Sequence, residues 1–112
     1  MIRPWVAVED AYLKAAATQL GNVPVNNKAI IKKVTLLNTD STTTRTATLW
    51  FVPSGGTRGN SNAIVLTHAL APLEEFEVVV GMNRTLNAEA QIWGQGDADD
   101  KINVHISGVL QS

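Results

Sequence analysis

Two β-rich runs joined by a short polar connection span residues 29–53 and constrain the fold more than any other feature. The runs read AIIKKVTLLNTD and RTATLWFVP, with STTT between them. Val, Ile, Thr and aromatic residues are enriched in strands, whereas Asn38, Asp40 and Ser41 are typical of turns. The pattern predicts two antiparallel strands connected by a tight loop.

Alternation of apolar and polar residues assigns faces to these two strands. The first, 29–37, is predicted to place Ile30, Val34 and Leu36 on one face and Ile31, Lys33, Thr35 and Leu37 on the other, with Lys32 near an exposed beginning. The second, 45–52, sets Ala47, Leu49 and Phe51 against Thr46, Thr48 and Trp50. On this polar face, Trp50 either covers a neighbouring strand or marks an interface.

The same alternation recurs along the chain. Further strands are predicted at 18–23, 63–70, 73–80, 85–93 and 101–110, with turns at 53–62, 81–84 and 94–100. Their predicted apolar faces hold Ile64 and Leu66, then Phe76, Val78 and Val80, then Leu86, Ala88, Ala90 and Ile92, and finally Ile102, Val104, Ile106, Gly108 and Leu110. The last strand is the clearest, and it is expected to be integral to the core.

The number of strands and the length of the chain define a fold class. At 112 residues the chain fits one domain without staples, and it contains no cysteine. About seven or eight short strands, spaced about 8 to 12 residues apart with turns between them, predict an all-β fold. We expect an antiparallel β-sandwich of jelly-roll or Greek-key type, with an N-terminal arm at 1–17 and the sandwich domain at 18–112.

The N-terminal arm carries apolar side chains that are costly to leave in water, namely Ile2, Trp5, Val6 and Val8. It is expected to dock, either as an edge strand of the domain's own sheet or on a neighbouring subunit. Residues 9–17 combine helical propensity with an acidic start, which favours a short helix. A strand through Tyr12 and Leu13 is the alternative.

Residues with the potential for metal or reaction chemistry are scattered. The histidines, His68 and His105, lie in different predicted strands and have no partner at a metal-ligand spacing. The acids of the 94–100 turn lack the Gly and terminal Glu of a calcium loop and are expected to lie in a solvated hairpin turn; they are Asp97, Asp99 and Asp100. Glu75 and Glu77 are expected to lie on the solvent-exposed face of a strand and not to act as the carboxylate pair of a glycosidase. The sequence predicts no catalytic residue, no metal, no cofactor and therefore no enzyme.

The loop at 53–62 reads PSGGTRGNSN and is predicted to be a mobile surface loop carrying Arg58. It lacks the Lys-Ser/Thr pair that a phosphate-binding P-loop requires. A net charge of −1 gives the chain no electrostatic reason to bind nucleic acid or an acidic membrane. The N-terminus has none of the features of a secretory signal, so we expect a soluble protein made without export.

Several of these phrases resemble small β-sandwich virion proteins of tailed bacteriophages. In that group a phrase of the form "IIKKI.LCNT....TVTL..VPSGG" opens the sandwich and a strand ending in "ISG" closes it; here the phrases are AIIKKVTLLNTDSTTTRTATLWFVPSGG and INVHISGVL. The resemblance runs from about Thr18 to the C-terminus and leaves the arm outside. Leu37 stands where a Cys is frequent, which is a conservative packing change.

The resemblance implies a bacteriophage virion structural protein. We expect a capsid decoration (cement) protein that is synthesised in the host cytoplasm and located on the capsid surface. It is expected to form homo-oligomers and to stabilise the shell by bridging neighbouring subunits, with the major capsid protein as its partner. The residues expected at its interfaces are Ile2, Trp5, Val6, Val8, Trp50 and Arg58. A tail, neck or fibre component is the alternative, as is a carbohydrate- or receptor-binding module that would present Trp50 and Trp93 together on neighbouring strands.

Overall fold

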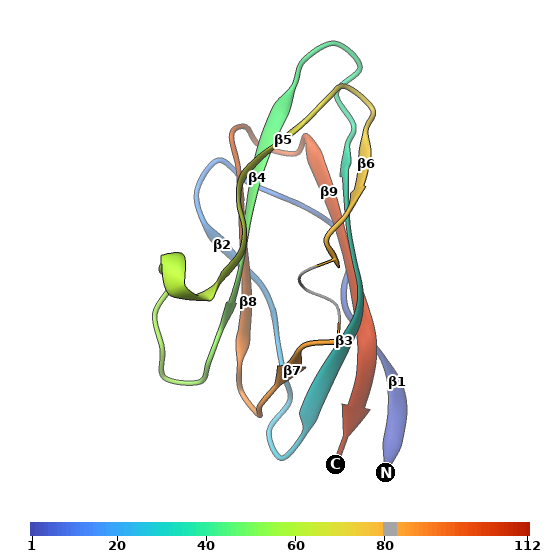
Figure 1. The fold of residues 1–112 in the computed structure, drawn as a ribbon, viewed down its shortest axis with the longest axis vertical. Helices are drawn as coiled ribbons and strands as arrows, with labels where there is room; N and C mark the ends of the chain where they lie inside the picture. Colours follow the sequence, from blue (N-terminus) through green and yellow to red (C-terminus); the bar gives the residue numbers. More distant parts are fainter. Residues whose placement is uncertain (80–82) are drawn as a thin grey trace.

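The computed structural model describes residues 1–79 and 83–112, apart from the side chain of Asp10. Within these residues the chain forms nine β-strands and one short 3-10 turn, η1 (Asn60–Asn62) (Figure 1). The strands are β1 (Ile2–Tyr12), β2 (Thr18–Asn22), β3 (Lys28–Asn38), β4 (Arg45–Val52), β5 (Ala63–Leu70), β6 (Glu75–Glu77), β7 (Thr85–Leu86), β8 (Gln91–Gly96) and β9 (Ile102–Gln111).

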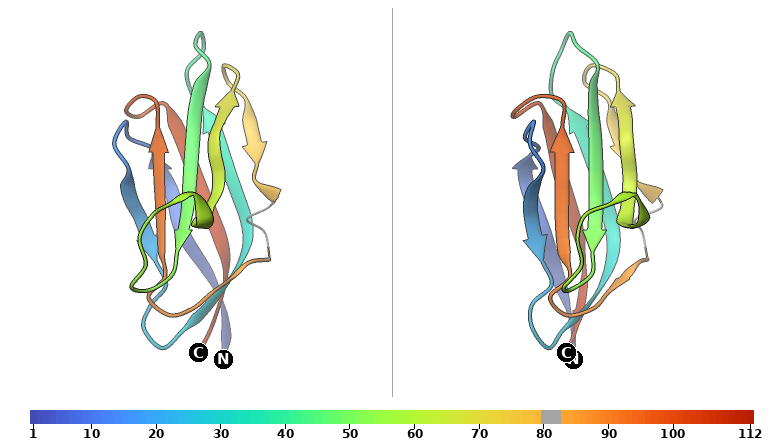
Figure 2. Two further views of the ribbon diagram at one scale, coloured as in Figure 1. Left: turned by 60° about the vertical axis from the view of Figure 1, so that its left-hand side comes forward. Right: turned by 90° about the vertical axis from the view of Figure 1, so that its left-hand side faces the viewer.

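The strands form two antiparallel sheets packed face to face, as the two turned views show (Figure 2). One sheet has the order β1-β9-β3-β6 and the other the order β2-β8-β4-β5. β7 pairs with β3 further along the same edge as β6, so these two short strands share one place in the first sheet. Apart from β4–β5 and β6–β7, each pair of consecutive strands is divided between the two sheets. This interleaving is a jelly roll, which confirms the predicted sandwich class.

The core lies between the sheets and consists of aliphatic side chains from both. In β9, Ile102, Val104, Ile106 and Leu110 are at most 2% exposed, as the alternation predicted. In β4, the predicted inner residues Ala47, Leu49 and Phe51 are also buried. A fully buried aliphatic side chain contributes roughly 1.5 to 3 kcal/mol, so the inner face of β9 alone is a large share of the stability of a small domain.

The predicted hairpin over 29–53 is wrong. β3 lies between β9 and β6 in one sheet, whereas β4 lies between β8 and β5 in the other. The connection at 39–44 therefore passes from sheet to sheet at one end of the sandwich (Figure 1). Turn-forming residues signal that the chain reverses, but they do not determine whether the next strand pairs with the previous one or packs across from it.

Two β-bulges change the predicted faces of β3 and β5. The register of β3 against β9 shifts between Ile31 and Lys33, so Ile31 is buried and Ile30 is only half-buried, the reverse of the prediction. In β5 the register against β4 shifts near Thr67, whose φ is +46°. Leu66, predicted to share an inner face with Ile64, is consequently 54% exposed. A bulge inserts one residue and moves all later side chains to the other face.

The segments after β5 are shorter than predicted. Within 73–80 only Glu75–Glu77 is strand, with Phe76 half-buried, Val78 buried and both glutamates exposed. Val80 and the first two residues of the predicted 81–84 turn lie outside the described residues. The predicted strand at 85–93 is two strands, β7 and β8, in different sheets. A turn with a positive φ at Glu89 separates them.

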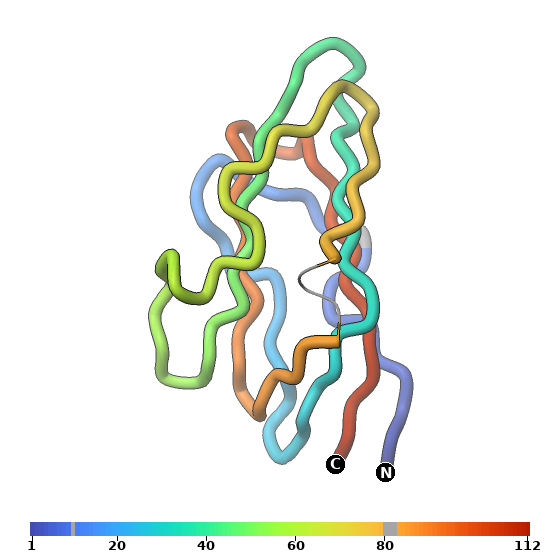
Figure 3. Tube along the Cα trace, in the orientation of Figure 1, coloured from blue at the N-terminus to red at the C-terminus, as the bar shows by residue number. Residues whose placement is uncertain are grey.

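The N-terminal segment is an edge strand of the molecule's own sheet. β1 pairs with β9 from Ile2 opposite Gln111 to Tyr12 opposite Asn103, and the two termini lie side by side (Figure 3). The short helix predicted at 9–17 is wrong, and the strand alternative is correct through Tyr12. Leu13 follows, fully buried, and its N–H donates to the carbonyl of Ile102. Pairing and burial outweigh a helical propensity of a few tenths of a kcal/mol per residue.

Gly94 marks a tightly packed place in the core rather than the turn predicted at 94–100. It lies inside β8, and a Cβ there would be 2.6 Å from Cδ2 of Leu13 and 2.9 Å from Cδ1 of Leu20. Only glycine fits under these leucines, because cores are close-packed. The turn itself begins at Asp97.

Replacing Gly94 by alanine is expected to lower the free energy of unfolding by about 1 to 3 kcal/mol, because the added methyl overpacks the core. Urea unfolding followed by tryptophan fluorescence measures the change. Gly59→Ala is the matched control: Gly59 has extended φ and nothing within 4 Å of its Cβ position, so its stability should not change. Equal effects of the two substitutions would contradict the packing assigned to β8.

Candidate functional site

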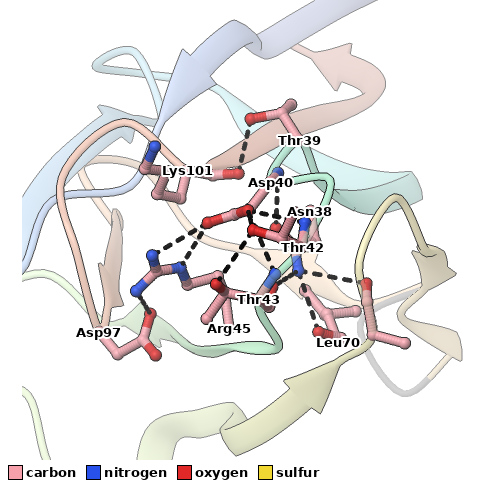
Figure 4. A network of polar contacts seen from close by, with 10 residues as sticks. Asn38, Thr39, Asp40, Thr42, Thr43, Arg45, Leu70, Asp97 and Lys101 are labelled. Carbon is pink, nitrogen blue, oxygen red and sulfur yellow. Dashed lines mark hydrogen bonds and ion pairs between the residues drawn. The ribbon is translucent and has the colours of Figure 1, made fainter.

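A polar network closes the end of the sandwich opposite the chain termini (Figures 1 and 4). Asn38 at the end of β3 is fully buried. Its Nδ2 donates to the carbonyls of Thr43 (3.0 Å), Leu70 (3.0 Å) and Ala71 (3.1 Å), and its Oδ1 accepts from the N–H of Asp40 (2.9 Å). One side chain therefore fastens the 39–44 connection to the end of β5.

Asp40 is the charged member of this network. Its carboxylate accepts hydrogen bonds from the N–H of Thr42 (3.0 Å), the N–H of Thr43 (3.2 Å), and Nε (3.2 Å) and a terminal nitrogen (3.0 Å) of Arg45. The N–H of Thr42 and the Arg45 guanidinium hold the pKa of Asp40 well below its usual range. These groups all satisfy one another, so the network is a structural joint and not a reactive site.

Asp40→Asn is expected to flatten the acid side of the stability profile. Because the pKa of Asp40 is lower in the folded chain, its contribution is complete above the unfolded value of about 3.9 and is lost progressively as the pH falls from that value through the lower pKa of the folded chain. Urea unfolding at a series of pH values from neutral to strongly acid measures this. The variant should be less stable at neutral pH and converge on the parent chain in acid; parallel profiles would contradict the assignment.

The two histidines lie in different sheets and have different neighbours. His68 in β5 stacks on Phe76, with ring centroids 4.0 Å apart and an interplanar angle of 19°. His105 in β9 lies opposite Thr35 of β3, its neighbouring strand in the same sheet. In the ranges 1–79 and 83–112, no three His, Cys, Asp or Glu side chains gather as a metal site would require. The absence of metal stays a prediction.

The acids at 97–100 each face a different partner. Asp100 forms an ion pair with Lys14 (2.6 Å), Asp99 accepts the N–H of Ala15 (2.8 Å), and Asp97 lies 4.0 Å from Arg45. The segment is not a hairpin turn as predicted, because β8 and β9 belong to different sheets. Asp99 and Asp100 instead tie this connection to the segment that follows β1, and Asp97 lies beside Arg45 at the start of β4.

The predicted interface residues occupy two separate places. In β1, Ile2 and Val6 are 66% and 51% exposed, whereas Val8 is buried and Trp5 packs against the core. The exposed side chains at the start of β1 therefore offer apolar surface, whereas the buried side chains of the strand belong to the core of the domain. β1 begins beside the C-terminus, at the end of the molecule where the two termini meet (Figure 3).

Trp50 and Arg58 meet on the opposite sheet. Trp50 of β4 is only 8% exposed because it is covered from outside, and its direct partner across to β8 is Trp93. Cζ of Arg58 lies 5.3 Å from the ring centroid of Trp50 and 4.8 Å from that of Trp93. Trp50 thus lies beside Trp93 and under Arg58. The 53–62 loop is at the surface as predicted, and its mobility stays a prediction.

An apolar groove that the sequence does not predict lies between β5 and β6. It has a volume of about 300 Å³ and lies where the edge strands of the two sheets, β5 and β6, come together. Leu66 and Val79 are exposed along it. Only the bulge near Thr67 turns Leu66 outward, and a bulge has no reliable signal in a single sequence.

The fold and these surfaces define a compact jelly-roll module with apolar and aromatic contact surfaces. No known family model matches the chain, and no curated protein matches it in sequence. The described residues contain no helix long and apolar enough to cross a membrane.

Among solved structures, the chain is similar to chains from infectious bursal disease virus. One comes from the crystal structure of the T13 viral particle, with a TM-score of 0.52 and 8% identity over 98% of this chain and 30% of that chain. Another comes from the Gx strain, with a TM-score of 0.51 and 10% identity over 97% of this chain and 32% of that one. The present chain spans about a third of their length, and the likeness is one of fold.

Proposed function

We propose that this chain is a structural component of a virus particle, and more narrowly a bacteriophage capsid decoration protein. The observation that carries the proposal is the jelly roll itself, which aligns over nearly the whole chain with a chain of a viral particle. The resemblance of 18–112 to virion proteins of tailed bacteriophages supports the narrower assignment. Tail, neck and fibre components share that resemblance and are the alternative.

The proposed partners are the major capsid protein and further copies of the chain. A specific interface needs roughly 1,000 Å² or more of buried surface. The start of β1 supplies exposed apolar side chains, Ile2 and Val6, next to the partly buried Trp5. Many weak contacts on a closed shell add up, so each copy needs only modest affinity. In this proposal the segment 1–17 contacts a neighbouring subunit through the exposed side chains at its start, while the backbone of β1 stays paired with β9.

Charged substitutions at the exposed end of β1 test this proposal. Ile2→Asp and Val6→Asp together should leave the unfolding transition nearly unchanged, because both side chains are exposed, while lowering retention on purified capsids at least tenfold. Retention is measured by sedimentation of capsids with added protein.

Leu73→Asp is the matched control, because Leu73 is 62% exposed at the opposite end of the sandwich. It should bind like the parent chain. Full retention of the Ile2 and Val6 variant would show that the arm is not the contact, and failure of the parent chain to bind any capsid would contradict the decoration role itself.

A further inference from the structure

Arg58 of the 53–62 loop lies over the outward face of β4 and β8. Trp50 and Trp93 lie side by side beneath the guanidinium of Arg58, at the centroid distances given above. A guanidinium over indole faces is attracted by their π-systems and keeps its N–H groups available at its edge. Among the described residues Arg58 forms no ion pair, whereas Arg45 is paired with Asp40.

The loop that carries Arg58 is fixed on both sides of it. The N–H of Gly56 donates to the carbonyl of Pro53 (2.9 Å). Nδ2 of Asn62 donates to the carbonyl of Thr57 (2.8 Å), and Oδ1 of Asn62 accepts the N–H of Gly59 (3.2 Å). These bonds and the two indoles hold the guanidinium in place before any ligand arrives, which lowers the entropic cost of binding.

A cavity of about 210 Å³ lies beside Arg58, lined by Val52, Gly56, Thr57, Arg58, Gln91 and Trp93. None of these described lining residues carries a carboxylate. Oε1 of Gln91 accepts the indole N–H of Trp93 (2.8 Å), which leaves the amide nitrogen of Gln91 to donate outward. With the guanidinium, the cavity therefore offers hydrogen-bond donors next to an aromatic ring, and this chemistry suits an anionic ligand with a ring-shaped body.

The size and charge of the cavity limit the class of ligand that it can bind. Pockets for drug-sized molecules measure about 300 to 1,000 Å³, so this smaller cavity suits a single ring. Of the described residues that line it, Arg58 is the only cation, which matches a single negative charge. Nucleic acid binding instead draws on several phosphate contacts from a basic surface.

We infer that the Trp50–Arg58–Trp93 cluster binds a carboxylate-bearing pyranose at the end of a glycan. The guanidinium receives the carboxylate in a bidentate pair, the sugar ring packs against the part of Trp93 that lines the cavity beside Arg58, and the Gln91 amide donates to a hydroxyl. This inference goes beyond the proposed function, because a capsid component needs no sugar site. A uronic acid and a sialic acid share the required chemistry.

Titration of the folded chain with simple glycosides, followed by the indole N–H signals in NMR spectra, tests the inference. The ligands are the methyl glycosides of N-acetylneuraminic acid and of glucuronic acid, the methyl ester of each, and methyl glucoside. At least one acid should shift the Trp93 signal with a Kd of about 1 mM, and the neutral compounds should bind at least tenfold more weakly. The acid that binds identifies the source of the carboxylate.

Variants separate the guanidinium from general effects on the fold. Arg58→Ala should abolish the shifts, and Arg58→Lys should weaken binding at least fivefold because an ammonium cannot form the bidentate pair. Arg3→Ala removes an exposed arginine from β1 and should bind like the parent chain. Equal binding of acids and neutral esters, unchanged binding by Arg58→Ala, or no shift at about 50 mM ligand would overturn the inference. Tighter binding of a single-stranded oligonucleotide than of either acid would overturn it as well.

Discussion

Deletion of residues 102–112 is expected to leave a chain that does not fold. β9 is the central strand of its sheet and pairs with β1 on one side and β3 on the other. Its inner residues Ile102, Val104, Ile106 and Leu110 are nearly fully buried. At roughly 1.5 to 3 kcal/mol each they contribute about 6 to 12 kcal/mol, comparable with the total stability of a small domain. Circular dichroism and thermal unfolding of the truncated chain measure the loss.

A shorter deletion provides the control. Removing only residues 111 and 112, which are exposed, keeps all four inner side chains and should preserve a cooperative transition. A chain truncated at residue 101 that still unfolds cooperatively would contradict the central place of β9.

Asn38→Ala is expected to cost at least about 3 kcal/mol of unfolding free energy. The substitution removes the donor to three backbone carbonyls and the acceptor for the N–H of Asp40, at a residue that is fully buried. A buried polar group left without its partner costs about 1 to 3 kcal/mol, and several are stranded together here. Urea unfolding at neutral pH measures the difference.

Asn103→Ala is the matched control. Asn103 is half-buried on the outward face of β9 and should change stability by less than about 0.5 kcal/mol. A loss below about 1 kcal/mol for Asn38→Ala would mean that water replaces the asparagine, and the joint would then not depend on it.

The sequence predicts strands well where alternation is uninterrupted. The bounds of β4 and β5 match the predicted strands, and the inner faces of β4 and β9 follow from period-two patterns because apolar residues recur at their inner positions. Prediction fails at Ile30 and Ile31, since the bulge beside them reverses the faces. It also fails for the 29–53 hairpin, because sheet membership depends on pairing with distant strands, β9 and β8, that local residues do not encode.

The candidate sites show the same division. Trp50, Trp93 and Arg58 can be named from the sequence, but their meeting depends on the register between β4 and β8 and on the path of the 53–62 loop. Ile2 and Val6 are recognisable as an apolar terminus, whereas the burial of Val8 depends on pairing with β9. Asn38, which reads as a turn residue, is the buried centre of the polar joint because the ends of β3 and β5 converge on it.

The most direct test of the virion assignment is quantitative mass spectrometry of purified particles, combined with cryo-electron microscopy of the same preparation. For a decoration protein, the expected result is a copy number of the chain comparable with that of the shell protein, with jelly-roll density on the outer surface of the shell. A few copies confined to the tail or neck would contradict the decoration role, and absence of the chain from purified particles would contradict a virion role altogether.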